Sequence, residues 1–161
     1  MEDLRKAIAD TGGILKGKFF FALATKGVVS CEYVNLDPTF TYPGLVRRFS
    51  QSLYAPFRGR VDVLAAPATG AIPLLYAGLV NERPSFRTVW ADKKPDGTFA
   101  FERMGFLRAV RNKRVAVLED ISSSGKTTRA LVELVERAGG VVVGVSLIWN
   151  RSGITAEKLG V

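Results

Sequence analysis

The chain has 161 residues, of which 47% are hydrophobic, so its length and composition predict one domain with a substantial apolar core. It contains a single cysteine, Cys31, and no histidine, which excludes an intrachain disulfide, His-based catalytic triads and most zinc sites. The formal net charge of +8 suggests an anionic partner. The sequence shows no apolar run of the roughly 20 residues that span a membrane and no signal-peptide core. Because the single cysteine excludes an intrachain disulfide, we expect the protein in a reducing cytoplasm.

Strand and helix patterns alternate along the chain. In chain order, the patterns predict a short helix at 2–10, strands at 18–24 and 28–36, a helix at 43–54, a buried strand at 61–66, a helix at 70–80, a strand at 86–90, an exposed loop at 91–98, a returning strand at 99–106, a buried strand at 115–118, a helix at 126–138 and a buried strand at 141–148. This alternation is typical of an α/β fold with a largely parallel sheet flanked by helices. Ligands of such sheets bind at the carboxyl ends of the strands, where the segments after 66, 118 and 148 should converge.

The stretch VAVLEDISSSGKTT, residues 115–128, contains two candidate phosphate sites. Its Gly-Lys-Thr step resembles the end of a Walker A loop, but Asp120 occupies the position at which that loop requires its first glycine. The other interpretation is a strand that ends in two acids, Glu119 and Asp120, followed by a hydroxyl-rich loop and a helix. Backbone N–H groups at the start of that helix would bind a phosphate, and the acids would accept hydrogen bonds from a ribose diol. The pattern therefore favours a ribose 5-phosphate site.

This stretch resembles the phosphoribosyl pyrophosphate (PRPP) motif of type I phosphoribosyltransferases. Other segments resemble the orotate phosphoribosyltransferase branch: GGILKGKFFFALATKGVVSCEYVNLD is similar to its N-terminal hood, AAPATGAIPLLYA to its pyrophosphate loop, FERMGF to the approach to its PRPP motif, and GVSLIWNRSG to a strand near its base site. The resemblance covers nearly the whole chain. It implies one phosphoribosyltransferase-like domain over 1–161, with a hood at about 1–40 and a core at about 41–161.

The resemblance also implies an activity and partners. The enzyme would transfer ribose 5-phosphate from PRPP to a base nitrogen, with orotate as the favoured base, forming orotidine 5′-monophosphate and releasing pyrophosphate. Mg²⁺ would bridge the ribose hydroxyls and the pyrophosphate, and a homodimer is expected, since the family's mobile loop usually crosses to the neighbouring subunit.

Residue roles follow from the same resemblance. Lys93, Lys94 and Asp120 would be catalytic, and Arg151 and Lys26 would contact the base. The PRPP site would consist of Glu119 and Asp120 at the ribose, of Ser122, Ser123, Ser124, Gly125, Lys126, Thr127 and Thr128 at the 5′-phosphate, and of Ala68, Thr69 and Gly70 at the pyrophosphate.

Two alternatives stay open from the sequence. The first is a non-catalytic or weakly catalytic PRPP-binding regulator or RNA-binding protein on the same fold. The positive net charge would attract RNA as well as phosphorylated metabolites. The second is a P-loop nucleotidase that uses Lys126. A steep dependence of binding on salt would favour RNA, whereas a Mg²⁺ requirement with PRPP would favour the transferase.

Overall fold

The computed structural model of the chain describes residues 4–21, 28–79, 86–151 and 153–161. Its N-terminal part holds helix α1 (Leu4–Asp10) and an antiparallel pair, β1 (Ile14–Phe21) and β2 (Val28–Val34). The first strand begins four residues before the predicted start at Lys18. Gly13 lets the chain turn closely between α1 and β1, since a Cβ atom there would lie 2.6 Å from the carbonyl oxygen of Asn35.

The remainder of the chain forms a five-stranded sheet in the order β5-β4-β3-β6-β7. Its strands are β3 (Val63–Pro67), β4 (Arg87–Lys93), β5 (Phe99–Ala100), β6 (Arg114–Ser122) and β7 (Val141–Asn150). All neighbours are parallel except β4 and the short β5, which form an antiparallel hairpin. The predicted α/β fold with a largely parallel sheet is thereby confirmed.

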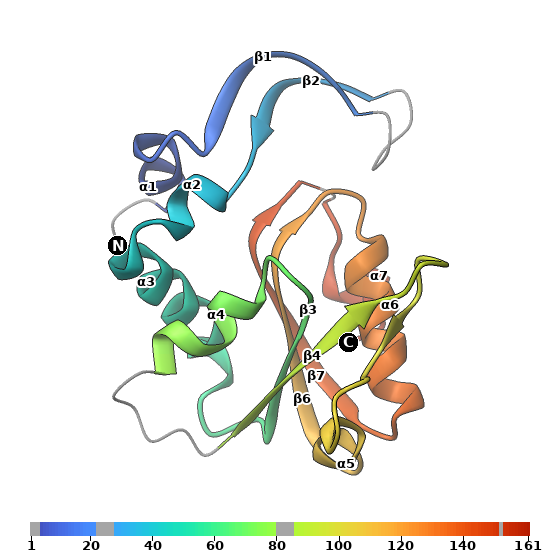
Figure 1. Cartoon of the computed structure of the whole chain (residues 1–161). Helices are drawn as coiled ribbons and strands as arrows, with labels where there is room; N and C mark the ends of the chain where they lie inside the picture. Colours follow the sequence, from blue (N-terminus) through green and yellow to red (C-terminus); the bar gives the residue numbers. More distant parts are fainter. Residues whose placement is uncertain (1–3, 22–27, 80–85, 152) are drawn as a thin grey trace.

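Helices cover both faces of this sheet, and each face has its own apolar cluster (Figure 1). On one face, Leu64 and Leu118 pack against Phe49 of α3 (Pro43–Tyr54) and against α4 (Ile72–Tyr76). On the other face, Val117 packs with Leu131 of α6 (Lys126–Arg137) and with α5 (Phe106–Val110). The short helices α2 (Asp37–Phe40), η1 (Ala55–Phe57), η2 (Ala77–Leu79) and α7 (Ala156–Leu159) complete the described elements.

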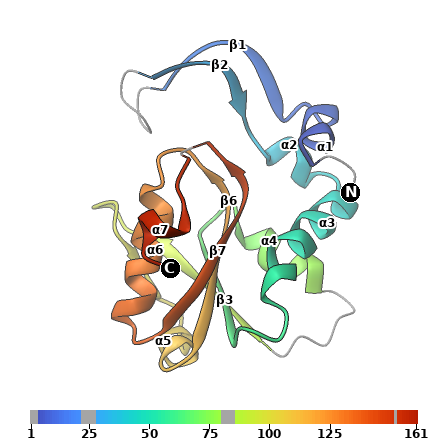
Figure 2. The ribbon, with the colours of Figure 1, turned by 180° about the vertical axis from the view of Figure 1, so that it is seen from behind.

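The β1–β2 hairpin lies beyond the carboxyl ends of β6 and β7, as both views of the ribbon show (Figures 1 and 2). Arg5 of α1 connects the two parts, because its guanidinium lies 5.1 Å from the centre of the Trp149 ring near the end of β7 and 2.6 Å from a carboxylate oxygen of Glu32 in β2. The hairpin is thus placed over the end of the sheet at which α/β proteins bind ligands.

Several predicted bounds change in the structure. The helix predicted at 43–54 is confirmed, whereas the strand predicted at 115–118 continues to Ser122 and carries both acids within it. The predicted loop at 91–98 is wrong at its start, because β4 continues to Lys93 and Ala91 is fully buried. The strand predicted at 99–106 is wrong beyond Ala100, and helix α5 begins at Phe106. Within the described residues, the structure has no helix with the length and hydrophobicity that crossing a membrane requires.

Candidate active site

A cleft of about 370 Å³ opens where β6 passes into α6. Gly125 precedes α6 with a left-handed φ of 73°, which turns the chain from the loop into the helix. The lining consists of Lys93, Glu119, Ile121, Ser122, Ser123, Ser124, Gly125, Lys126 and Thr127. The structure thus collects, in one hollow, most of the residues predicted to bind the 5′-phosphate, together with one predicted acid and one predicted lysine.

Glu119 lies in this cleft but is only 3% exposed. Burial raises the pKa of its carboxyl from 4.5 to about 7; a hydrogen bond from the Thr128 hydroxyl lowers this pKa, and the nearby charge of Asp120 raises it. A proton on Glu119 is therefore exchanged close to neutral pH, unless a ligand supplies donors that favour the carboxylate.

Asp120 has a different surrounding, because consecutive residues of a strand point to opposite faces. Its carboxylate lies directly against Gly70, so closely that a Cβ atom on Gly70 would overlap it. Burial also raises the pKa of Asp120, and backbone hydrogen bonds oppose that shift. The predicted pyrophosphate loop and the second predicted acid therefore meet, on the α4 side of the sheet, while Glu119 lies on the α6 side.

The predicted pyrophosphate loop, residues 68–70, follows β3. The Ala68–Thr69 peptide bond is cis. The Ala68 N–H already donates to the Ala91 carbonyl oxygen at 2.8 Å, which ties the end of β3 to β4. Of the three amides predicted for pyrophosphate, that of Ala68 is therefore engaged within the protein, while Thr69 is exposed and Gly70 half-buried.

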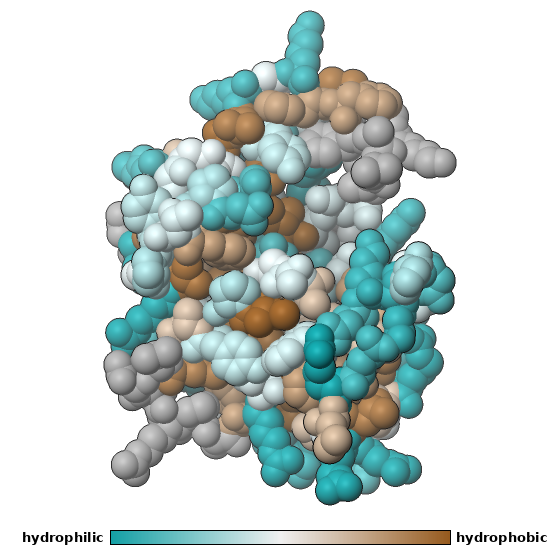
Figure 3. Space-filling model, viewed as in Figure 1, coloured by the Kyte–Doolittle hydropathy of each residue, from teal (hydrophilic) through white to brown (hydrophobic). Residues whose placement is uncertain are grey.

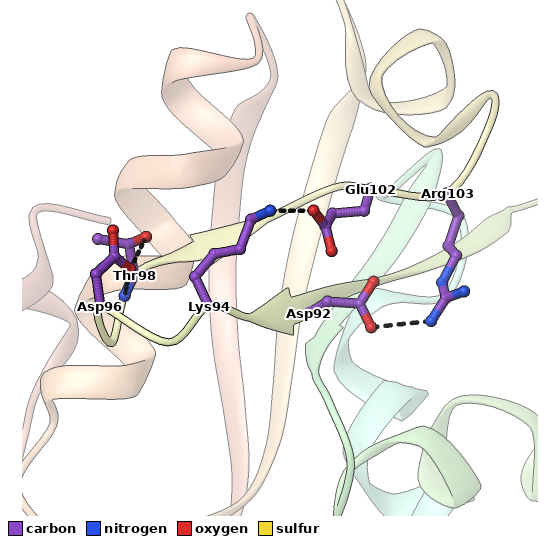
Figure 4. Close-up of polar contacts among 6 residues, drawn as sticks. All are labelled: Asp92, Lys94, Asp96, Thr98, Glu102 and Arg103. Carbon is purple, nitrogen blue, oxygen red and sulfur yellow. Dashed lines mark hydrogen bonds and ion pairs between the residues drawn. The ribbon is translucent and has the colours of Figure 1, made fainter.

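The two predicted catalytic lysines have different neighbours. Lys93 lines the cleft beside the phosphate loop of its own chain. Lys94 instead forms an ion pair with Glu102, which also raises the pKa of the lysine (Figure 4). A second ion pair joins Arg103 to Asp92 at 3.2 Å, so both pairs connect the end of β4 to the segment that follows β5. Lys93 is therefore available to a ligand in the cleft, whereas Lys94 is engaged by Glu102.

Two hydroxyls of the predicted phosphate loop point into the protein. Thr128 is fully buried and donates to Glu119, and its oxygen lies 3.1 Å from the hydroxyl of Ser122, which is 2% exposed. These contacts join the end of β6 to the first turn of α6. The sequence analysis assigned Thr128 to the phosphate and missed its contact with Glu119. The signal that could have indicated this contact is the spacing of the two residues, which lie nine positions apart at the two ends of a strand–loop–helix junction.

The predicted base contacts lie at the edge of this arrangement. The Arg151 amide donates to the Ser122 carbonyl oxygen at 2.9 Å, which places Arg151 beside the end of β6, although its side chain does not line the cleft. Lys26 falls outside the described residues. Among the residues that the structure describes, no three acidic or cysteine side chains cluster in a way that could hold a metal ion by themselves.

Comparison with known proteins places the chain in a family. No family model matches the sequence. The chain is 35% identical over 140 residues to an orotate phosphoribosyltransferase of Caldanaerobacter subterraneus subsp. tengcongensis, a match that covers 86% of this chain and 70% of the relative. The chain belongs to the orotate phosphoribosyltransferase family. Another member of this family, from a Thermoanaerobacter species, is 31% identical over 152 residues, covering 94% of this chain and 76% of its own length.

Solved structures of orotate phosphoribosyltransferases have the same fold. The enzyme of Aeropyrum pernix superposes with a TM-score of 0.68 at 18% identity, covering 98% of each chain. That of Mycobacterium tuberculosis gives a TM-score of 0.67 at 22% identity and covers 98% of this chain and 89% of its own. Membership of the orotate phosphoribosyltransferase family excludes the P-loop nucleotidase alternative, because the Gly-Lys-Thr step belongs here to the loop that follows two acids.

Proposed function

We propose that the protein transfers the 5-phosphoribosyl group of PRPP to orotate, forming orotidine 5′-monophosphate and pyrophosphate. The observation that carries this proposal is the cleft in which Glu119, the loop before α6 and Lys93 come together. Family membership supports orotate as the acceptor, since the relatives compared above are named for it.

The 5′-phosphate would lie at the start of α6. Backbone N–H groups of the first helical turn have no partner inside the helix, and the helix dipole adds a partial positive charge there. Lys126 supplies a full positive charge, and Ser123, Ser124 and Thr127 add hydroxyls in the cleft lining. Buried Ser122 and Thr128 would fix the loop rather than contact the phosphate.

The ribose would extend from that phosphate toward the acids of β6. Its hydroxyls would donate to Glu119, whose ionised form these hydrogen bonds would favour. Pyrophosphate would lie toward residues 69–70 and Lys93, so that the lysine offsets the negative charge that grows on the leaving group. The bond from C1 of the ribose to a pyrophosphate oxygen breaks and the electron pair leaves with pyrophosphate. The base nitrogen forms the new bond at C1 with inversion, and its proton is released to water. No side chain acts as a nucleophile in this scheme.

We also propose Mg²⁺ as a cofactor held mainly by the substrate. Mg²⁺ is usually bound by one or two carboxylates together with phosphate oxygens and water. Glu119 and Asp120 could supply a carboxylate ligand. Because they point to opposite faces of β6, only one of the two would face the ion. When bound, Mg²⁺ would neutralise charge on the departing pyrophosphate.

The assembly and the base contacts are further proposals. Arg151 is suited to the orotate carboxylate because a guanidinium binds a carboxylate through two hydrogen bonds, and Lys26 is the second candidate. A cytoplasmic location is supported by the free, exposed cysteine, Cys31. A homodimer is supported by the apolar side chains on the β1–β2 hairpin, where Phe20 is 67% and Val29 65% exposed. Light scattering of the purified protein would test the dimer.

The test of the activity is pyrophosphate release from PRPP and Mg²⁺ with orotate, uracil, adenine or hypoxanthine in parallel. We expect release with orotate, lost when Mg²⁺ is chelated and strongly reduced in Asp120→Asn. Glu136→Gln, which changes an exposed acid of α6, is the matched control and should stay active. Release with another base alone would refute orotate as the acceptor, and PRPP binding without turnover by any base would support the regulator alternative.

A further inference from the structure

A second cavity lies at the end of the sheet opposite to the cleft. It has a volume of about 450 Å³ and is lined by Leu107, Arg108, Arg111, Arg137, Ala138 and Gly139. These residues come from α5, from the turn before β6, and from the end of α6, which lie together at the foot of the ribbon in Figure 1. Hydrophilic residues also gather over this end of the molecule in the space-filling view (Figure 3).

Positive charge in this cavity is poorly compensated. Arg108 and Arg111 have no carboxylate within ion-pairing distance among the residues that the structure describes. Arg137 has one acidic neighbour, Glu133, at 3.7 Å, and both side chains are more than half exposed. An exposed pair at that distance is weak and can be exchanged for another anion. Three guanidinium groups that share one hollow repel one another, and a bound anion would relieve this repulsion.

The lining also has an apolar part. Leu107 is 55% exposed and lines the cavity together with Ala138, so an apolar surface lies beside the three guanidinium groups. Guanidinium groups bind phosphate oxygens through paired hydrogen bonds. A ligand that matches both parts has several phosphate charges and a less polar group attached to them. The volume exceeds what a single phosphate ion would occupy and suits a nucleotide-sized molecule.

The cavity is separate from the proposed active site. Strand β6 begins next to it at Arg114 and ends at the phosphate loop, and its nine residues span roughly 25 to 30 Å at about 3.3 Å per residue. Helix α6 runs the other way, from the phosphate loop to Arg137. A molecule in one site therefore cannot contact the other.

We propose that this arginine cavity binds a nucleoside triphosphate, with its phosphates on Arg108, Arg111 and Arg137 and its nucleoside toward Leu107. This site does not depend on the proposed activity, and binding can be measured whether or not the protein turns over PRPP.

The experiment is calorimetric titration of the whole protein with ATP, UTP and inorganic tripolyphosphate, each with and without saturating PRPP. We expect a nucleoside triphosphate to bind in the presence of PRPP, and more tightly than tripolyphosphate. The double variant Arg108→Ala/Arg111→Ala should weaken this binding at least about tenfold, because two charge-assisted contacts are lost. Arg47→Ala/Arg87→Ala removes the same charge from exposed positions outside the cavity and should change the affinity less than about twofold.

Several results would overturn the proposal. Displacement of the nucleotide by PRPP would assign the binding to the active-site cleft. Equal weakening in the two double variants would mean that net charge, not the cavity, attracts the ligand. Tripolyphosphate that binds as tightly as the nucleotides would refute the role given to Leu107. A preference for a 20-nucleotide RNA, with affinity that falls steeply as salt rises, would identify a nucleic-acid surface instead.

Discussion

Replacing Glu119 with Gln should change how the stability of the protein depends on pH. In the folded protein, burial raises the pKa of this carboxyl from 4.5 to about 7. The folded state therefore holds a proton that the unfolded chain has already released between these two pH values. The contribution of Glu119 to the free energy of unfolding is consequently highest below pH 4.5, and it falls as the pH rises toward 7. A gap of about 2.5 pH units, at about 1.4 kcal/mol per unit, corresponds to a loss of about 3 kcal/mol.

The variant isolates this contribution, because Gln does not titrate and can still accept the hydrogen bond from Thr128. Groups that do not interact with Glu119 titrate in both proteins and cancel in the difference, whereas the neighbouring Asp120 charge contributes to the shift that the variant removes. We expect the free energy of unfolding of Glu119→Gln, relative to the parent, to increase by about 3 kcal/mol between pH 4.5 and pH 7.5. Urea denaturation followed by tryptophan fluorescence, at constant ionic strength, measures this difference. Glu136→Gln serves as the control and should give a curve parallel to that of the parent.

Parallel curves for Glu119→Gln and the parent would refute the reasoning, since they would show that the pKa of Glu119 is the same in the folded and the unfolded protein. A second readout uses the ligand. If ribose hydroxyls donate to Glu119, PRPP should release a proton from it near pH 7, and calorimetry in buffers of different ionisation enthalpy would detect that proton. Its absence, with PRPP bound normally, would place the ribose elsewhere.

Other substitutions test the remaining contacts. Lys93→Ala should lower kcat roughly 100-fold or more, because it removes the positive charge that stabilises the leaving pyrophosphate. Lys94→Ala breaks only an exposed ion pair and should change kcat less than about fivefold. Steady-state pyrophosphate release compares the two variants. Gly70→Ala should push Asp120 aside and lower kcat/KM roughly 100-fold while urea denaturation shows a folded protein. Ser50→Ala should cost about 1 to 3 kcal/mol in urea denaturation, because the buried hydroxyl donates to one backbone carbonyl of the α4–η2 segment and accepts from one amide of it.

The elements that the sequence predicts well are those whose own residues decide them. Helix α3 has Pro43 in its first turn and four spaced apolar residues on one face, so local pattern alone sets its bounds. The same holds for the phosphate loop, since an apolar strand, a glycine and a helix start succeed one another in the chain. The family resemblance then connects distant segments that no periodicity relates.

The misplaced elements are those that depend on neighbours. Strand β6 continues through Glu119 because β7 pairs with it up to Ser122, and a polar strand end carries no apolar signal. Lys93 faces the cleft because β4 pairs with β5, whereas its sequence context is polar and turn-rich. Helix α5 is not predicted because only five residues form it, too few for a helical period to be recognised, although Phe106, Ala109 and Val110 lie on one apolar face. For both strands, pairing with a neighbour overrides a weak local preference.

The buried hydroxyl pair of Ser122 and Thr128 has a consequence for variation in this loop. It anchors both ends of the loop, so the residues between them, 123–127, can offer their backbone amides in a fixed arrangement. The side chains of Ser123 and Ser124 add hydroxyls to the phosphate site without holding the loop in place, so exchange of either for another small residue should weaken PRPP binding but still appear in a library of active variants. Ser122 and Thr128, whose buried hydroxyls hold the loop to the strand and the helix, should be the positions at which such a library permits least.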